Sequence, residues 1–276
     1  MQCMEVWGGS QLTAQGVGFS GLDAWIYSKP HGEAQRGGDV YYASSCATGR
    51  ITRLLLADVA GHGQAVASTA AELRTLMRQF VNRQDQTEFV SLLNRRFGAL
   101  YEDGTYATAL VTTFFAPKRL LSLCNAGHPR PLLYSARRRE WSLLSHHIAP
   151  ARSRLRNTPL GMIALAEYEQ LEVTLDPGDC LLCYTDALIE SHDAEGEMLG
   201  ESGVLEIARS LGEPGSAEAV AGKLLAAIGG RFAGNLTDDD VTVLAVMANG
   251  GPTWHSPKTM LKSVARAFTG EPIHGG

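Results

Sequence analysis

The chain lacks the apolar runs that cross membranes. Its 276 residues hold no stretch of about 18 consecutive apolar residues, so no membrane span is expected. The opening segment MQCMEVWGGSQ also lacks the basic stretch and apolar core of a secretory signal. We therefore expect a cytoplasmic location.

An excess of positive charge is missing too. The formal net charge is -5, which argues against a surface that binds nucleic acid generally. Hydrophobic residues make up 45% and charged residues 19%, an ordinary globular balance. A chain of this length can bury a substantial core, in one large domain or two small ones.

Cysteine is scarce, with five residues in the whole chain. Only Cys180 and Cys183 lie close in sequence, in the apolar run CLLCYTD. Positions three apart on a strand point to opposite faces, so neither a redox pair nor half of a zinc site is expected. Both are interpreted as small buried residues, and disulfides are not expected in a reducing compartment.

Apolar patterning divides the chain into strands and helices. Strands are predicted over 40–46, 51–59, 105–116, 120–126, 131–135, 141–144, 171–175, 180–186 and 241–246, and helices over 64–83, 86–101, 201–211 and 217–228. No repeat or long linker separates them. This order predicts a layered α+β fold with mainly antiparallel pairing, formed by one domain over 1–248. Residues 249–276 form a tail with apolar residues at helical spacing and basic residues between them.

The strands at 40–46 and 51–59 form a predicted hairpin with an aspartate at each outer end. If the turn centres between Thr48 and Gly49, Asp39 lies directly opposite Asp58, with Cβ atoms about 5 Å apart. Like charges at that distance repel, so a shared proton or a cation between them is expected. A shift of one residue in register would break this pairing.

Two further acidic positions have the same character. Asp186 ends the buried strand CLLCYTD, and Asp238, Asp239 and Asp240 directly precede the last strand. Each aspartate alone is more readily explained as a cap of a turn or helix. Carboxylates at the ends of several buried strands together suit a shared site for Mg²⁺ or Mn²⁺, which prefer oxygen ligands.

Seven short sequence motifs occur in order between about residues 35 and 247: GGDVYY, ADVAGHG, CNAGHPRPLLY, PLG, LDPGDCLLCYTDALIES, EGEMLGESGV and DDDVTVL. The ordered set resembles the PP2C-like serine/threonine phosphatases of bacteria, in the sporulation and stress-response group. The resemblance implies two mainly antiparallel sheets packed face to face with helices outside, an α-β-β-α sandwich. It also implies a phosphatase that acts on an anti-sigma-factor antagonist.

The resemblance further implies two Mn²⁺ or Mg²⁺ ions at one end of the sandwich. Asp58 would bridge the ions, and the backbone carbonyl of Val59 would bind one of them. Asp186 and Asp239 would bind the other ion, and Asp39 would act through metal-bound water. An attacking water activated by two metals needs no nucleophilic side chain of the enzyme.

Neighbouring residues receive supporting or open roles. Asp240 is expected to hold the metal ligands in position without binding a metal itself. Asp238 is expected to have no role. Gly61 lets the backbone approach the site closely. Two interpretations of His62 stay open, a general acid or a structural histidine at a helix start. His128, in NAGHP, is interpreted first as part of a tight turn near the site.

The sequence departs from the family pattern at three places. Tyr42 stands where many relatives have a second acidic residue, and Ala187 where many have glycine. Arg36 is offset from the phosphate-binding arginine of animal-type members. None of these removes an expected metal ligand, so they bear on substrate geometry more than on activity.

The sequence leaves three hypotheses for the function of the protein. The leading hypothesis is a metal-dependent phosphoprotein phosphatase, and the alternative is a catalytically weak relative that binds a signalling protein. The third hypothesis is a nucleotide cyclase built around the motif GGD, but it does not account for the later motifs YTD and DDDV. The segment around Trp7 and Trp25 is interpreted as an edge strand, or else as a docking strip for a partner or a second copy in a homodimer.

Overall fold

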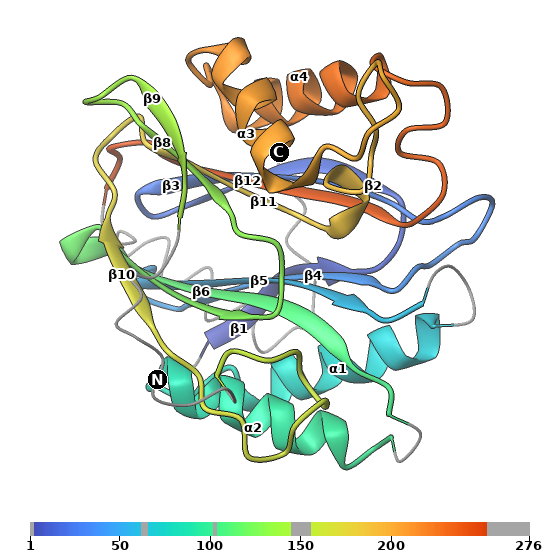
Figure 1. Cartoon of the computed structure of the whole chain (residues 1–276). Helices are drawn as coiled ribbons and strands as arrows, with labels where there is room; N and C mark the ends of the chain where they lie inside the picture. Colours follow the sequence, from blue (N-terminus) through green and yellow to red (C-terminus); the bar gives the residue numbers. More distant parts are fainter. Residues whose placement is uncertain (1–2, 62–65, 102–103, 145–155, 253–276) are drawn as a thin grey trace.

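Two six-stranded antiparallel sheets form the centre of the molecule (Figure 1). The computed structural model describes residues 3–61, 66–101, 104–144 and 156–252. Sheet A has the order β1 (Cys3–Gly9), β4 (Asp39–Cys46), β5 (Ile51–Val59), β6 (Ala107–Phe115), β7 (Leu120–Ala126), β10 (Leu171–Thr174). Sheet B has the order β2 (Thr13–Phe19), β3 (Leu22–Lys29), β12 (Val241–Ala248), β11 (Cys180–Tyr184), β8 (Leu132–Ser135), β9 (Glu140–Leu143).

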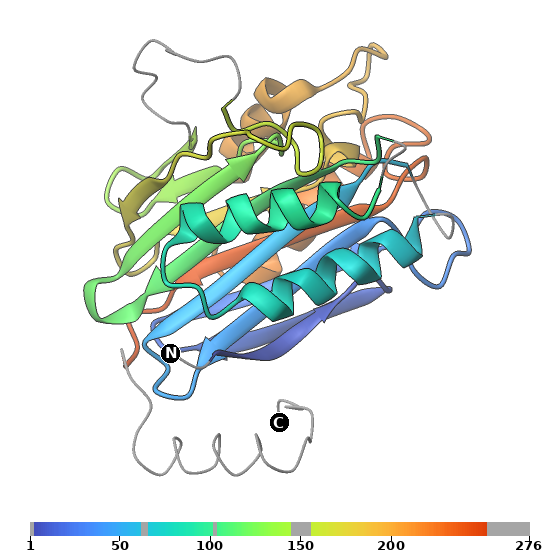
Figure 2. The same ribbon diagram turned by 90° about the horizontal axis from the view of Figure 1, so that it is seen from below.

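A pair of helices covers the outer face of each sheet. Helices α1 (Ala67–Phe80) and α2 (Gln86–Gly98) lie side by side across sheet A, as Figure 2 shows from below. Helices α3 (Gly200–Leu211) and α4 (Ala217–Gly229) cover sheet B (Figure 1). The predicted α+β sandwich with an α-β-β-α order of layers is therefore confirmed.

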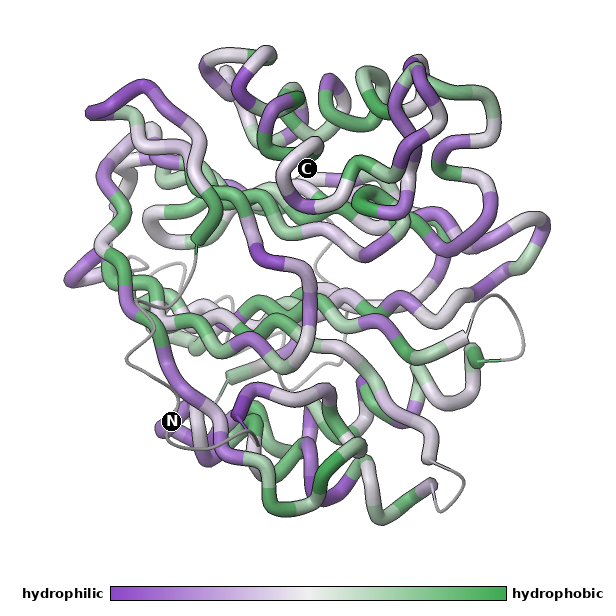
Figure 3. Tube along the Cα trace, in the orientation of Figure 1, coloured by the Kyte–Doolittle hydropathy of each residue, from purple (hydrophilic) through white to green (hydrophobic). Residues whose placement is uncertain are grey.

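Three apolar layers hold these elements together, and Figure 3 shows apolar residues following the strands of both sheets. On β5, Leu55 and Ala57 pack beneath α1 and α2, whereas Leu54 and Leu56 pack between the sheets. Successive side chains of a strand point to opposite faces. Asp58 continues the series of Leu54 and Leu56, so its side chain faces sheet B.

The same alternation separates the two close cysteines. Cys180 packs in the layer beneath α3 and α4, and Cys183 packs between the sheets. Both are buried free thiols. The predicted placement of these two cysteines on opposite faces of the strand is confirmed.

The first thirty residues form more strands than the sequence indicated. Trp7 lies on β1, an edge strand of sheet A, which agrees with the interpretation as an edge strand. Trp25 lies on β3, between β2 and β12 inside sheet B, so an edge position for this residue is wrong. Pairing of β3 with β12 joins the start of the chain to its last strand, a contact that no local pattern indicates.

Some expectations fall on residues outside the described ranges. These are His62, the first residues of the helix expected from residue 64, and the greater part of the tail, 253–276. Within the described ranges, no helix combines the length and the apolar character needed to cross a membrane.

Candidate active site

The predicted register of the first hairpin is confirmed. Asp39 pairs with Asp58 across β4 and β5, and Asp58 pairs in turn with Thr108 on β6. The three residues therefore form a row at one end of sheet A. Because Asp58 faces sheet B, the row lies at the end of the space between the two sheets.

Sheet B holds the carboxylate of Asp39 directly. The hydroxyl of Thr185 donates a hydrogen bond to Asp39 Oδ2 at 2.9 Å, and the Thr242 amide donates to Thr185 Oγ1 at 3.0 Å. Asp39 is only 3% exposed and Thr185 is completely buried. Thr185, in the motif YTD, thus connects sheet B to Asp39, in the motif GGD. The sequence analysis missed this contact.

Asp240 anchors the loop that leads into β4. Its carboxylate accepts hydrogen bonds from the amides of His31 and Gly38, both at 2.6 Å. A Cβ atom on Gly37 would lie 2.3 Å from Asp240 Oδ1, which no side chain could occupy. Gly37 therefore allows the Asp240 carboxylate to approach the backbone directly before Asp39.

The backbone after β5 lies against the same loop. The Val59 amide donates to the Gly38 carbonyl at 3.3 Å, and a Cβ on Gly38 would lie 3.0 Å from the Val59 carbonyl oxygen. Gly61 has φ +102°, in the region that favours glycine. The Val59 carbonyl and Gly61 thus lie beside the end of the strand that carries Asp58.

The remaining aspartates lie at the facing end of sheet B. Asp186 begins a short 3-10 helix, Asp186–Leu188, two residues after β11, and Asp239 lies two residues before β12. Strands β11 and β12 are antiparallel, with Tyr184 opposite Val243, so both aspartates emerge at one edge. Asp239 Oδ1 accepts a hydrogen bond from the Asp240 amide at 2.7 Å.

Burial and mutual repulsion raise the pKa values of these carboxyls. Burial, followed by the charges of Asp186 and Asp239, raises the pKa of Asp58 to about 8. Burial, followed by Glu190 and Asp239, raises the pKa of Asp186 to about 6. Burial and the charge of Asp58 hold the pKa of Asp39 well above its usual range. Asp58 on sheet A thus lies within reach of the charges of Asp186 and Asp239 at the end of sheet B.

The described residues contain no three His, Cys, Asp or Glu side chains that already converge on one point as a metal cage. The carboxylates instead line a shared edge, where repulsion opposes closer approach. Clustered carboxylate oxygens fit hard divalent cations, which would offset the repulsion that helps to raise the pKa values of Asp39, Asp58 and Asp186.

Glu190 is an acidic member of this region that the sequence analysis missed. Its amide donates to the Asp186 carbonyl at 2.9 Å, one helical turn beyond that aspartate. Its charge contributes to the raised pKa values of both Asp186 and Asp58. In the motif DALIE, Glu190 follows Asp186 by four residues. This spacing places both side chains on one face of a helical turn and could have indicated that Glu190 belongs to the site.

His128 lies in the tight turn expected for NAGHP. The Asn125 side chain accepts from the His128 amide and donates to the His128 carbonyl, both at 2.8 Å, and Gly127 has φ +70°. His128 Nδ1 lies 2.8 Å from the hydroxyl of Thr108, the residue opposite Asp58. Burial lowers the pKa of His128 to about 3, so the ring is neutral near pH 7 and serves as a structural contact.

The structure shows where two of the three departures from the family pattern lie. Tyr42 is 2% exposed and packs beneath α1, on the face of β4 opposite Asp39. An acidic residue there would not join the row formed by Asp39 and Asp58. Ala187 lies next to Asp186 and is buried.

The two packed sheets with outer helices are the fold of PP2C-type phosphatases, and several solved structures share it. The RsbU and RsbW domains of a Mycobacterium tuberculosis protein are 25% identical, with a TM-score of 0.68. That match covers 87% of this chain and 63% of the mycobacterial chain, so the chain spans less than two thirds of it.

Two further structures share the fold at lower identity. The PP2C domain with a regulatory fragment of SpoIIE from Bacillus subtilis is 15% identical, with a TM-score of 0.64, over 89% of this chain and 66% of that one. The catalytic domain of the serine/threonine phosphatase PstP, solved with two manganese ions, is 18% identical, with a TM-score of 0.56, over 83% and 98%. Residues 48–249 match the family model of stage II sporulation protein E, and the chain belongs to this family.

Proposed function

We propose that the chain is a metal-dependent serine/threonine phosphoprotein phosphatase. The observation that carries this proposal is the meeting of acidic strand ends from both sheets, Asp39 and Asp58 from sheet A with Asp186 and Asp239 from sheet B. Membership of the stage II sporulation protein E family supports the reaction class. We also propose that residues 1–248 act as one domain.

The metal ligands are proposed from the family resemblance, and the positions of the acidic residues are compatible with it. Asp58 lies opposite Asp39 and near the charges of Asp186 and Asp239, and by the family resemblance it would contact both of two Mn²⁺ or Mg²⁺ ions. The Val59 carbonyl would bind one ion, and Asp186 and Asp239 the other. Bound ions of this kind lower the pKa of a water and neutralise charge on the phosphoryl oxygens.

The chain's own residues hold this site in shape. Thr185 fixes the orientation of the Asp39 carboxylate by its hydrogen bond at 2.9 Å. Asp240 fixes the loop before Asp39 through two backbone amides. The role of the protein is thus to place carboxylate oxygens and the substrate in fixed positions, which is the main protein contribution to phosphoryl transfer.

The proposed substrate is a phosphoserine or phosphothreonine of a small anti-sigma-factor antagonist. The likeness to RsbU and RsbW domains and to a sporulation phosphatase supports this class. We expect dephosphorylation of such an antagonist to be far faster than that of unrelated phosphopeptides. Equal rates on both would overturn the substrate while leaving the reaction class intact.

Manganese-dependent release of p-nitrophenol from p-nitrophenyl phosphate tests the reaction class. The proposal predicts turnover with Mn²⁺, loss with a chelator, and recovery when the metal is restored. Binding of a phosphorylated antagonist without any turnover would favour the alternative, a catalytically weak relative that acts as a binding module.

A further inference from the structure

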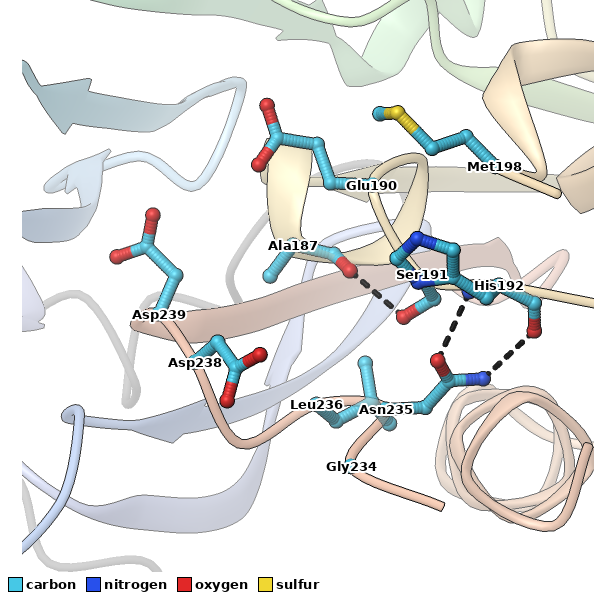
Figure 4. A pocket seen from close by; sticks show the side chains of 10 residues that line it. All are labelled: Ala187, Glu190, Ser191, His192, Met198, Gly234, Asn235, Leu236, Asp238 and Asp239. Atoms are coloured by element: carbon cyan, nitrogen blue, oxygen red, sulfur yellow. Dashed lines mark hydrogen bonds between the residues drawn. The ribbon is translucent and has the colours of Figure 1, made fainter. Parts of the chain in front are cut away.

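A pocket of about 270 Å³ lies directly beside the candidate active site (Figure 4). It is lined by Ala187, Glu190, Ser191, His192, Met198, Gly234, Asn235, Leu236, Asp238 and Asp239. In Figure 4, Glu190 and Met198 stand on one side of it and Asp238 on the other. Pockets for whole small molecules usually hold about 300–1,000 Å³, so this size suits a single side chain better than a cofactor.

The backbone of the pocket is held by its own hydrogen bonds. Asn235 accepts from the His192 amide and donates to the His192 carbonyl, both at 2.8 Å, and Ser191 donates to the Ala187 carbonyl at 2.8 Å. All three bonds are dashed in Figure 4, and the two between Asn235 and His192 join segments 43 positions apart in the sequence. The pocket therefore has fixed walls built from satisfied polar groups.

The pocket combines one sign of charge with apolar surface. Glu190, Asp238 and Asp239 supply carboxylates, and none of the described lining residues is a lysine or arginine. Met198 is 59% exposed and contributes apolar surface. Lysine and arginine side chains match this combination, since their alkyl stems cover apolar surface while their charged ends meet carboxylates.

The pocket is continuous with the acidic strand ends. Asp239 belongs to both, and Ala187 directly follows Asp186. A ligand held at the aspartates therefore has its neighbouring groups within reach of the pocket. A residue of extended chain spans about 3.3–3.6 Å, so a few residues suffice to connect the two places.

We propose that this pocket binds a lysine or arginine side chain of the phosphoprotein while its phosphorylated residue lies at the aspartates. The inference rests on the proposed phosphatase function and adds a basis for choosing among phosphoproteins. The Asp238 carboxylate, which accepts a hydrogen bond from the Thr237 hydroxyl at 2.9 Å, is the contact that can be changed without altering an expected metal ligand.

The test uses phosphoserine peptides that differ at one position, carrying arginine, norleucine or glutamate at each place from three before to three after the phosphoserine. At the best position we expect arginine to raise kcat/KM about two- to fivefold over norleucine, the effect of one partly exposed ion pair. Glutamate should lower it. Asp238→Lys should remove the preference for arginine, and Met198→Lys should do the same independently.

Two controls separate the pocket from the rest of the enzyme. Glu195→Gln removes an exposed carboxylate outside the pocket and should keep the arginine preference. Far-UV circular dichroism and thermal melts of Asp238→Lys and Met198→Lys should match those of the wild type, and this shows that both variants fold.

The outcomes distinguish the two proposals. No arginine preference in the wild type, or a preference that survives both charge changes, overturns the pocket assignment. A manganese titration in which Asp238→Asn loses one bound ion, with no arginine preference, assigns the pocket to a cation instead. Calorimetric binding of the arginine peptide that depends on Asp238, without turnover of any phosphoester, would retain the pocket and reject the phosphatase.

Discussion

Strand β5 carries two charged side chains with opposite surroundings, the buried Arg53 and the half-buried Asp58. The guanidinium of Arg53 donates to Thr113 Oγ1 at 2.9 Å and to the carbonyls of Val81 and Arg83 at 2.8 and 2.9 Å. It also lies 4.9 Å from the centre of the Phe89 ring. This charge is paired with oxygen acceptors and fixes the connection between α1 and α2 to the sheet.

Asp58, five residues further along the same strand, has the opposite surroundings. It is half-buried, and its partial burial together with the charges of Asp186 and Asp239 raises its pKa to about 8. A buried charge that is surrounded by its own sign costs stability unless a cation is added. On β5, Arg53 thus has a structural role, whereas Asp58 has the surroundings of a ligand-binding residue. Strongly shifted pKa values such as that of Asp58 are typical of functional sites.

The largest expected effect is on activity at Asp58. Asp58→Asn keeps the shape but removes a charge from the residue expected to touch both ions, so turnover of p-nitrophenyl phosphate should be abolished. In the metal-free protein the same change should be neutral or stabilising, because it removes repulsion with Asp39. Asp238→Asn is the matched control and should retain p-nitrophenyl phosphate turnover.

A large loss of stability is expected at Arg53. Arg53→Met removes the guanidinium donors of the buried Val81 carbonyl and the partly buried Arg83 carbonyl, so we expect the free energy of unfolding to fall by about 3 kcal/mol, within the range for breaking buried polar networks. Urea unfolding of the metal-free protein measures this. An Arg53→Met protein as stable as the wild type would remove the structural half of the comparison.

A partial loss is expected at Asp39. Asp39→Asn should lower the rate less than Asp58→Asn, since Asp39 is expected to contribute mainly to one ion. Titration with Mn²⁺ should show a weaker apparent affinity and recovery of part of the rate at excess metal. A loss that no Mn²⁺ concentration reverses would place Asp39 in a role other than metal binding.

The smallest expected effect is a pH dependence of the metal-free protein. Folded Asp58 and Asp186 titrate near pH 8 and 6, above their ordinary value of 3.8. Between about pH 4 and 8 the folded chain thus binds more protons than the unfolded chain, so these groups make stability fall as pH rises. Thermal melts without metal should show this slope, and Asp58→Asn should flatten its upper part between about pH 6 and 8.

The sequence was sufficient for features set by local pattern. The pairing of Asp39 with Asp58 followed from the position of one turn, and the separation of Cys180 from Cys183 followed from strand alternation. The contact of Thr185 with Asp39 could not be predicted this way, because it joins residues 146 positions apart in different sheets. The inner position of β3 and the pocket beside Asp239 depend on such long-range packing in the same way.

Titration calorimetry of Mn²⁺ into the metal-free protein tests the central claim most directly. The account predicts two ions bound per wild-type chain, with protons released because the carboxyls of raised pKa must ionise. It predicts that Asp58→Asn loses this binding, together with turnover and with the gain in melting temperature that metal gives the wild type. An Asp58→Asn protein that binds two Mn²⁺ ions with wild-type affinity and retains manganese-dependent turnover would contradict it.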